Sequence, residues 1–323
     1  MKTSIIEELL PYVIQFNILN DKLNRQPMLN KPIFDEPSHT YINSIEGYLY
    51  TSVTTLVGKY KEKFDDNYWS LYNAGRRLLQ IPDDEASKKK YAGKLLNEGL
   101  DFNNKTEYNL RQALKVVLQE KYNLLGAEQL AEKNRWKDTT KKATDVGTKV
   151  HKYKEDSLKE IGIDLSLFGL DVKVIDLVND IDDLSKLQDG VYPELMVWNN
   201  QFKIAGISDK ITIETIGNKR FVDIDDYKTY KKVDTTSYLN KATGEYKKML
   251  HPIHHLQDSN YIHASLQLSM YGYFLECFGF TIRNIKFTHI IMDADKTKIL
   301  GEQPYHCKYL KEECISILQH YAK

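Results

Sequence analysis

The sequence predicts an α/β protein whose larger C-terminal part mixes strands and helices and whose N-terminal region is mainly helical. The chain has 323 residues, enough for one large or two modest domains with their own cores. From residue 136 on, segments with the period-two alternation of strands are interspersed with helical patterns, whereas helical patterns dominate before it. We therefore expect a helical region over residues 1–135 and an α/β core over residues 136–323.

Composition limits the possible partners and compartments. The 45 basic and 45 acidic side chains cancel, so any nucleic-acid site must be a local groove. The three cysteines are scattered and include no C-x-x-C pair, which argues against an iron–sulfur cluster and favours a reducing compartment. The sequence contains no apolar run as long as a membrane span and no leader pattern. We expect a cytoplasmic protein, in the host cytoplasm if it is phage-encoded.

The N-terminal region reads mostly as helix. Residues 1–30 are expected to form a helix, and residues 32–50 to be less regular, with a short strand or hairpin over IEGYLYTSV (residues 45–53). Ser52 is a candidate N-cap for a helix that carries Lys59 and two further lysines. Helices are then expected up to residue 136, with breaks near Pro82, over residues 99–104 and at Gly126.

Residues 136–162 are expected to form one helix in which His151 lies one turn beyond Gly147 on the same face. A glycine inside a helix costs about 1 kcal/mol relative to alanine. Close approach of a backbone or a ligand would explain Gly147, and so would tight helix packing. His151 taken alone is also compatible with an ordinary half-buried histidine.

Two alternating runs, residues 201–216 and 219–232, are joined by Gly217 and Asn218. A Gly-Asn pair between two such runs predicts a short β-hairpin. With a two-residue loop, Ile216 pairs with Lys219 and every further pair has residue numbers that sum to 435. This register places Asp209 opposite Asp226.

Both aspartates interrupt apolar rows on their strands, because side chains alternate with period two. Opposed side chains have Cβ atoms roughly 4.5–5.5 Å apart, and like charges at that spacing are destabilising. A divalent cation bound by both carboxylates would offset the repulsion. Lys228 shares the face of Asp226, which suits metal-assisted attack on a phosphodiester. The alternative is that these acids sit at a solvated strand end.

A strand is expected over VYPELMVW, after a helix over residues 165–187. Glu194 is a third acid in an apolar row there, and it is either a further carboxylate of the site or an edge residue. Residues 233–259 read as a polar, irregular insertion whose H-x-x-H-H pattern (His251 to His255) is a weak zinc signal, because no fourth soft ligand is near.

The last part of the chain is expected to contain a helix over residues 260–279, a strand over 285–293 and a closing helix over 311–322. Gln267 occurs at an inward position of the first helix. A buried amide needs partners, so Gln267 either bonds within the core or orients a lysine, a water or a phosphate.

Five motifs follow one another in order: G-T-x-x-H (Gly147 to His151), the strand glutamate Glu194, A-G-x-x-D (Ala205 to Asp209), D-x-K-T (Asp226 to Thr229) and Q-x-x-x-Y (Gln267 to Tyr271). In this combination the chain resembles the PD-(D/E)XK nuclease superfamily, and within it the exonuclease branch of RecB-type nuclease domains, the mitochondrial genome maintenance exonuclease and tailed-phage exonucleases. Ser208 stands where the superfamily name expects proline.

The resemblance implies a restriction-endonuclease-like core with a central mixed sheet of four to five strands flanked by helices. It implies Mg²⁺ or Mn²⁺ as cofactor, with the metal ligands His151, Glu194, Asp209, Asp226 and the main-chain carbonyl of Tyr227. Lys228 would orient the attacking water or stabilise the pentacovalent phosphate, and Gln267 with Tyr271 would hold Lys228 or the scissile strand. The residues expected to contact DNA are Ser52, Thr54, Lys59, Thr229 and Lys231.

The expected function is a metal-dependent DNA exonuclease that hydrolyses phosphodiester bonds of single-stranded or end-containing DNA in replication, repair or recombination. Two alternatives remain open at this point. One is a structure-specific endonuclease. The other is a non-catalytic nucleic-acid-binding or recombination scaffold that keeps the nuclease fold.

Overall fold

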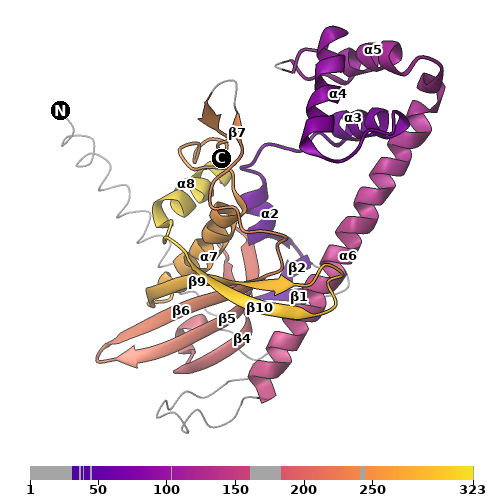
Figure 1. The fold of residues 1–323 in the computed structure, drawn as a ribbon. Coiled ribbons are helices and arrows are strands. Elements are labelled where there is room, and N and C mark those ends of the chain that lie inside the picture. Colours follow the sequence, from indigo (N-terminus) through magenta and orange to yellow (C-terminus); the bar gives the residue numbers. More distant parts are fainter. Residues whose placement is uncertain are drawn as a thin grey trace, which may run out of the picture. The chain divides into compact units, whose positions relative to one another are not determined.

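The computed structural model describes residues 31–35, 38, 40–43, 46–102, 104–160, 183–240 and 244–322 (Figure 1). The helix expected over residues 1–30, and most of the one expected over 165–187, lie outside these residues. The chain divides into two compact units. Lys63–Val146 form a helical unit, and the described residues up to Glu62 and from Gly147 onward form a sheet unit.

The helical unit contains α3 (Asp66–Leu78), α4 (Glu85–Asn97), α5 (Glu107–Leu118), the 3₁₀ helix η1 (Gln119–Leu124) and the first part of α6 (Leu125–Glu160). Asp65, Asp84 and Thr106 each cap a helix by accepting a hydrogen bond from a backbone N–H of its first turn. The breaks expected near Pro82 and over residues 99–104 separate these helices. Gly126, expected as a break, instead lies in the first turn of α6.

The helix α6 runs without interruption through the boundary expected at residue 136. Nothing between Leu125 and Glu160 is a strong helix breaker, since Gly147 costs the helix only about 1 kcal/mol. Residues 137–142 are all exposed, so this middle stretch has no apolar face of its own. The described residues from Lys31 to Glu62, expected in the helical region, belong to the sheet unit because β3 pairs with β5.

The sheet unit contains a mixed eight-stranded sheet among the described residues, flanked by helices. Its strands are β1 (Pro32–Asp35), β2 (Thr40–Asn43), β3 (Leu49–Ser52), β4 (Gly190–Asn199), β5 (Ile204–Ile216), β6 (Lys219–Lys228), β9 (Thr281–Met292) and β10 (Ile299–His306). The strand order is β1-β2-β3-β5-β6-β9-β10, and β4 pairs with β5. The expected four to five strands were too few, because β1 to β3 and β10 extend the sheet.

Hairpin β5–β6 has the predicted register. Ile216 pairs with Lys219, and the ladder continues to Lys210 and Asp225, so each pair sums to 435. Gly217 has φ = 61°, a left-handed value that glycine adopts without the steric cost of a Cβ. The facing pair Asp209 and Asp226 comes one step beyond the last ladder pair.

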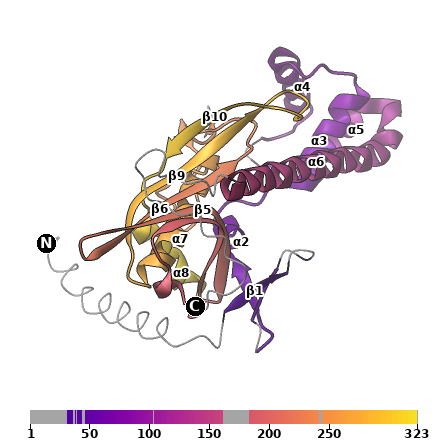
Figure 2. The same ribbon diagram turned by 90° about the horizontal axis from the view of Figure 1, so that it is seen from below.

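Helix α7 (Asn260–Glu276) packs against β4, β5, β6 and β9 (Figure 1, Figure 2). Helices α2 (Val53–Gly58) and α8 (Lys311–Tyr321) pack on α7 in turn. The insertion that precedes α7 is irregular, as expected, apart from the two-residue strands β7 (Leu239–Asn240) and β8 (Glu245–Tyr246). Among the described helices, none combines the length and the apolarity that crossing a bilayer requires.

The packing of α3 on α4 and α5 depends on a glycine, which gives a first testable prediction. A Cβ on Gly75 would overlap Leu114 and the Tyr91 hydroxyl, whereas a Cβ on Gly93 of α4 would meet no atom within 4 Å. We expect Gly75→Ala to lower the free energy of unfolding of the helical unit by about 1–3 kcal/mol. Gly93→Ala should leave it unchanged or raise it by up to about 1 kcal/mol. Hydrogen exchange of the α3 and α5 amides measures both effects, and equal protection in the two variants would contradict this packing.

Candidate metal centre

The candidate site lies where the edge of β5 changes its partner. Along this edge β3 pairs with Ile204 and Ala205, and β6 pairs from Lys210 onward. Asp209 sits at the end of the interval between these two ladders and is only 6% exposed. Its Oδ2 accepts a hydrogen bond from the backbone N–H of Tyr227 at 2.5 Å, so a carboxylate takes the place of a ladder partner.

Two further side chains converge on Asp209. His151, on α6, has its Nδ1 3.0 Å from Asp209 Oδ1. Glu194 lies across from Asp209 on β4, because its neighbours Pro193 and Leu195 pair with the residues on either side of Asp209. One ligand atom each from His151, Glu194 and Asp209 lies within 4.8 Å of the other two, so this group could hold a metal ion.

Glu194 occupies its place with a backbone φ of 50° in the middle of a strand. Left-handed values are uncommon for residues with a Cβ and cost of order 1–3 kcal/mol when the surroundings impose them. Such strain tends to occur at functional sites. The strand prediction for Glu194 was correct, but the alternation rule gave no sign of this conformation.

The electrostatics of the three groups reflect their crowding. Burial, followed by the charge of Asp209, raises the pKa of Glu194 to about 8. Burial would also raise the pKa of Asp209, but the hydrogen bond and charge of His151 bring it below its usual value. Burial alone would lower the pKa of His151. The hydrogen bond to Asp209 and the charges of the nearby carboxylates outweigh burial, so the net pKa of His151 is raised.

Asp226 is 1% exposed and forms an ion pair with Lys228 on the same face of β6. Burial and the charge of Asp209 raise the pKa of the Asp226 carboxyl. Burial would lower the pKa of Lys228, but the Asp226 charge outweighs it and the net shift is upward. In the structure Asp226 therefore faces the lysine rather than joining the His151, Glu194 and Asp209 group.

Lys228 is held from α7. Its Nζ donates a hydrogen bond to Gln267 Oε1 at 3.1 Å, and Gln267 Nε2 donates to the Tyr271 hydroxyl at 3.0 Å. Gln267 thus fills both roles left open for it, because it bonds to the buried Tyr271 and also holds a lysine. A Cβ on Gly206 would lie 2.6 Å from Cε1 of Tyr271, so the glycine of the A-G-x-x-D motif makes room for this ring.

The residues expected to contact DNA lie outside this cluster, and three of them, Ser52, Thr54 and Lys59, have local partners. Ser52 caps α2 by accepting a hydrogen bond from the Thr55 N–H, and its Oγ lies 3.1 Å from Thr54 Oγ1. Helix α2 ends at Gly58, so the expected lysines follow the helix instead of lying in it, and Lys59 stacks over the Tyr321 ring. 

Thr229 lies beside Gly147, with its Oγ1 3.7 Å from where a Cβ of that glycine would be. This spacing is ordinary van der Waals contact, so Gly147 is not explained by close packing of protein atoms. Lys231 is exposed.

Two contributions to the site were not predicted from the sequence. The Tyr227 N–H, rather than the carbonyl expected there, is the group seen to bond to Asp209. Lys154 lies over the Tyr227 ring, 5.4 Å from its centroid, and forms an ion pair with Glu302 of β10. Its position three residues after His151 on α6 was the available signal.

Comparisons of the chain with protein-family models, with curated proteins and with solved structures found no match.

Metal binding by this group is directly testable. We expect Mn²⁺ to raise the midpoint temperature of unfolding, because an ion that binds only the folded state stabilises it, by about 2.7 kcal/mol at 100 times its Kd. Asp209→Asn should abolish this rise. Asp223→Asn is the matched control, since Asp223 is on the opposite face of β6 from Asp226 and pairs with Arg283. A rise of the same size in Asp209→Asn would refute the proposed ligand.

The raised pKa of Glu194 predicts a pH dependence of stability in the absence of divalent metal. The pKa of Glu194 in the folded state lies above its value in the unfolded state. The contribution of Glu194 to the free energy of unfolding is therefore fully present below about pH 4.5 and is lost as the pH rises through about 8. Glu194→Gln lacks this ionisation. In urea unfolding, we expect the free energy of unfolding of the variant to increase relative to that of the wild type by at least about 1 kcal/mol between pH 5 and pH 9. A difference that does not change with pH would contradict the assignment.

Proposed function

We propose that the protein is a metal-dependent DNA nuclease, acting as an exonuclease on single-stranded or end-containing DNA. The observation that carries this proposal is the placement of His151, Glu194 and Asp209 within reach of one ion, next to the ion pair of Asp226 and Lys228. The resemblance to the PD-(D/E)XK superfamily assigns the same residues to phosphodiester hydrolysis. A role in replication, repair or recombination would follow from that resemblance.

The donor set fits Mg²⁺ or Mn²⁺. Carboxylate oxygens are the ligands that these hard cations prefer, and the single imidazole of His151 is tolerated more readily by Mn²⁺. Asp226 and the Tyr227 carbonyl stay candidate ligands. A divalent cation at this position would polarise a phosphoryl oxygen and lower the pKa of water.

Lys228 supplies a fixed positive charge. Its raised pKa keeps the ammonium protonated at neutral pH, so it is unsuited to act as a base and suited to stabilise negative charge that develops on a phosphate. The Gln267 amide restricts where that ammonium points. Of the two roles considered for Lys228, charge stabilisation is therefore the one we favour.

The architecture is compatible with a restriction-endonuclease-like core. The acids come from an antiparallel hairpin, β5–β6, whose second strand runs parallel to β9. Helix α7 covers this sheet and contributes Gln267 and Tyr271. These features support the proposed fold family.

The function is tested with end-labelled linear single-stranded DNA in Mg²⁺ or Mn²⁺. We expect degradation from an end in the wild type and a loss of rate of at least about 10²-fold in Asp226→Asn and in Lys228→Met, as for removal of one electrostatic stabiliser. Lys219→Met, an exposed lysine at the hairpin end, is the matched control and should retain activity.

The outcomes separate the alternatives. Cutting of closed circular single strands would favour an endonuclease. DNA binding without metal-dependent cleavage in any protein would favour a scaffold. Activity that survives both Asp226→Asn and Lys228→Met would refute this active site.

A further inference from the structure

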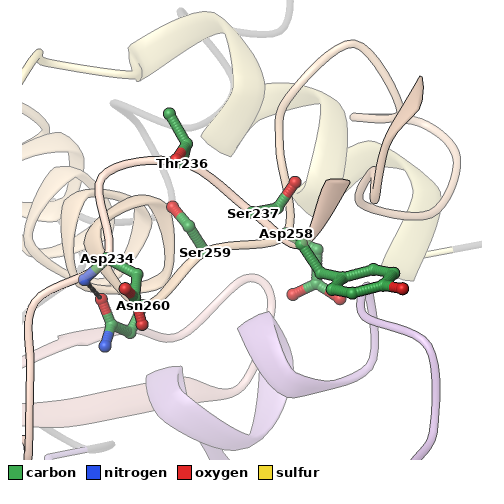
Figure 3. A pocket seen from close by; sticks show the side chains of 7 residues that line it. Asp234, Thr236, Ser237, Asp258, Ser259 and Asn260 are labelled. Atoms are coloured by element: carbon green, nitrogen blue, oxygen red, sulfur yellow. Dashed lines mark hydrogen bonds between the residues drawn. The ribbon is translucent and has the colours of Figure 1, made fainter. Parts of the chain in front are cut away.

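A cavity of about 390 Å³ opens at the start of α7. It is lined on one side by residues between Asp234 and Tyr238, and on the other by residues from Asp258 to Asn260. Figure 3 shows Asp234 and Asn260 side by side, where the Asp234 N–H bonds to the Asn260 side chain. Its size is in the range of small-ligand sites.

Helix α7 connects the cavity with the lysine beside the candidate metal centre. Gln267, which holds Lys228, is seven residues beyond Asn260 on α7, a distance of about 10 Å at 1.5 Å per residue. A ligand that spans both places would be about as long as a few linked nucleotides.

Hydrogen bonds between the two lining segments fix the shape of the cavity. The Asn260 side chain accepts from the Asp234 N–H and donates to the Lys232 carbonyl, each at 2.8 Å. Ser237 donates through its N–H to Gln257 Oε1 at 2.9 Å and through its Oγ to the Lys247 carbonyl at 2.6 Å. The walls are therefore formed before any ligand binds.

The lining chemistry suits an uncharged polar group and disfavours a phosphate. Among the lining residues, the charged ones are both acidic. Asp258 pairs with Lys247 at 2.9 Å and lies 2.7 Å from His263 Nε2, so the Lys247 ammonium is already engaged and is not directed at a ligand. Hydroxyl groups can donate to or accept from a base edge. Tyr238 adds an aromatic ring that is 72% exposed.

We propose that this cavity binds one nucleobase of the single strand whose phosphate lies at the metal centre, with the base stacked on Tyr238. Stacking on an aromatic side chain and hydrogen bonding to the base edge are the contacts that hold unpaired nucleotides. This inference rests on the proposed function, because it takes the substrate to be single-stranded DNA.

The test is a double-mutant cycle between Tyr238 and the bases. Affinity is measured by fluorescence anisotropy in the Asp226→Asn background, for a 12-mer oligonucleotide and for the same backbone made only of abasic units. Tyr238→Ala should weaken binding of the intact strand by about 5- to 150-fold, as for one stacked base, and leave binding of the abasic strand unchanged. Thr236→Trp, which fills the cavity from an exposed position, should act in the same way.

Tyr246→Ala is the matched control, because Tyr246 is another exposed tyrosine on the neighbouring strand β8 and does not line the cavity. It should affect neither strand. If Tyr238→Ala and Thr236→Trp change both strands equally or neither, the nucleobase site is wrong, even when the wild type cleaves DNA. If the coupling is found but the wild type cleaves nothing, the cavity inference stands and the nuclease proposal fails.

Discussion

The structure depends on the crowding of negative charge around Asp209. A buried carboxylate is costly unless it is paired or bound to a cation. Here Asp209, Glu194 and Asp226 share one neighbourhood, and the raised pKa values of the latter two record the cost. His151 and Lys228 offset part of it. Three acids held so closely are hard to explain as a purely structural arrangement, and this is the reason to consider a metal centre.

The sheet is built so that these acids can meet. Because β3 and β6 share one edge of β5 without filling it, a short interval of that strand has no ladder partner there among the described residues. The Asp209 side chain occupies this interval and bonds the Tyr227 backbone. Gly206, within the same interval, lets Tyr271 approach, and through Gln267 this contact reaches Lys228. The positions of the acids and of the lysine thus both depend on this interval of β5.

The residues of the two strands and their loop were sufficient to predict the hairpin. The Gly217-Asn218 loop fixed the register, and period-two alternation then placed Asp209 and Asp226 on buried faces. Local sequence was not sufficient to predict features that depend on tertiary contacts. The strands β1 to β3 and β10 join the sheet through pairing with distant segments. Helix α6 continues past residue 136, because local helix propensity does not mark where one compact unit ends and the next begins. The left-handed Glu194 and the Lys228 to Gln267 bond depend on three-dimensional packing that no short motif specifies.

His151, Glu194 and Asp209 are proposed to bind one divalent cation together, and anomalous diffraction from crystals soaked in Mn²⁺ is the decisive experiment. We expect a Mn²⁺ peak in contact with the imidazole of His151 and with carboxylate oxygens of Glu194 and Asp209, at roughly 2.0–2.3 Å. A fully occupied Mn²⁺ peak elsewhere, with these three side chains uncoordinated, would contradict it.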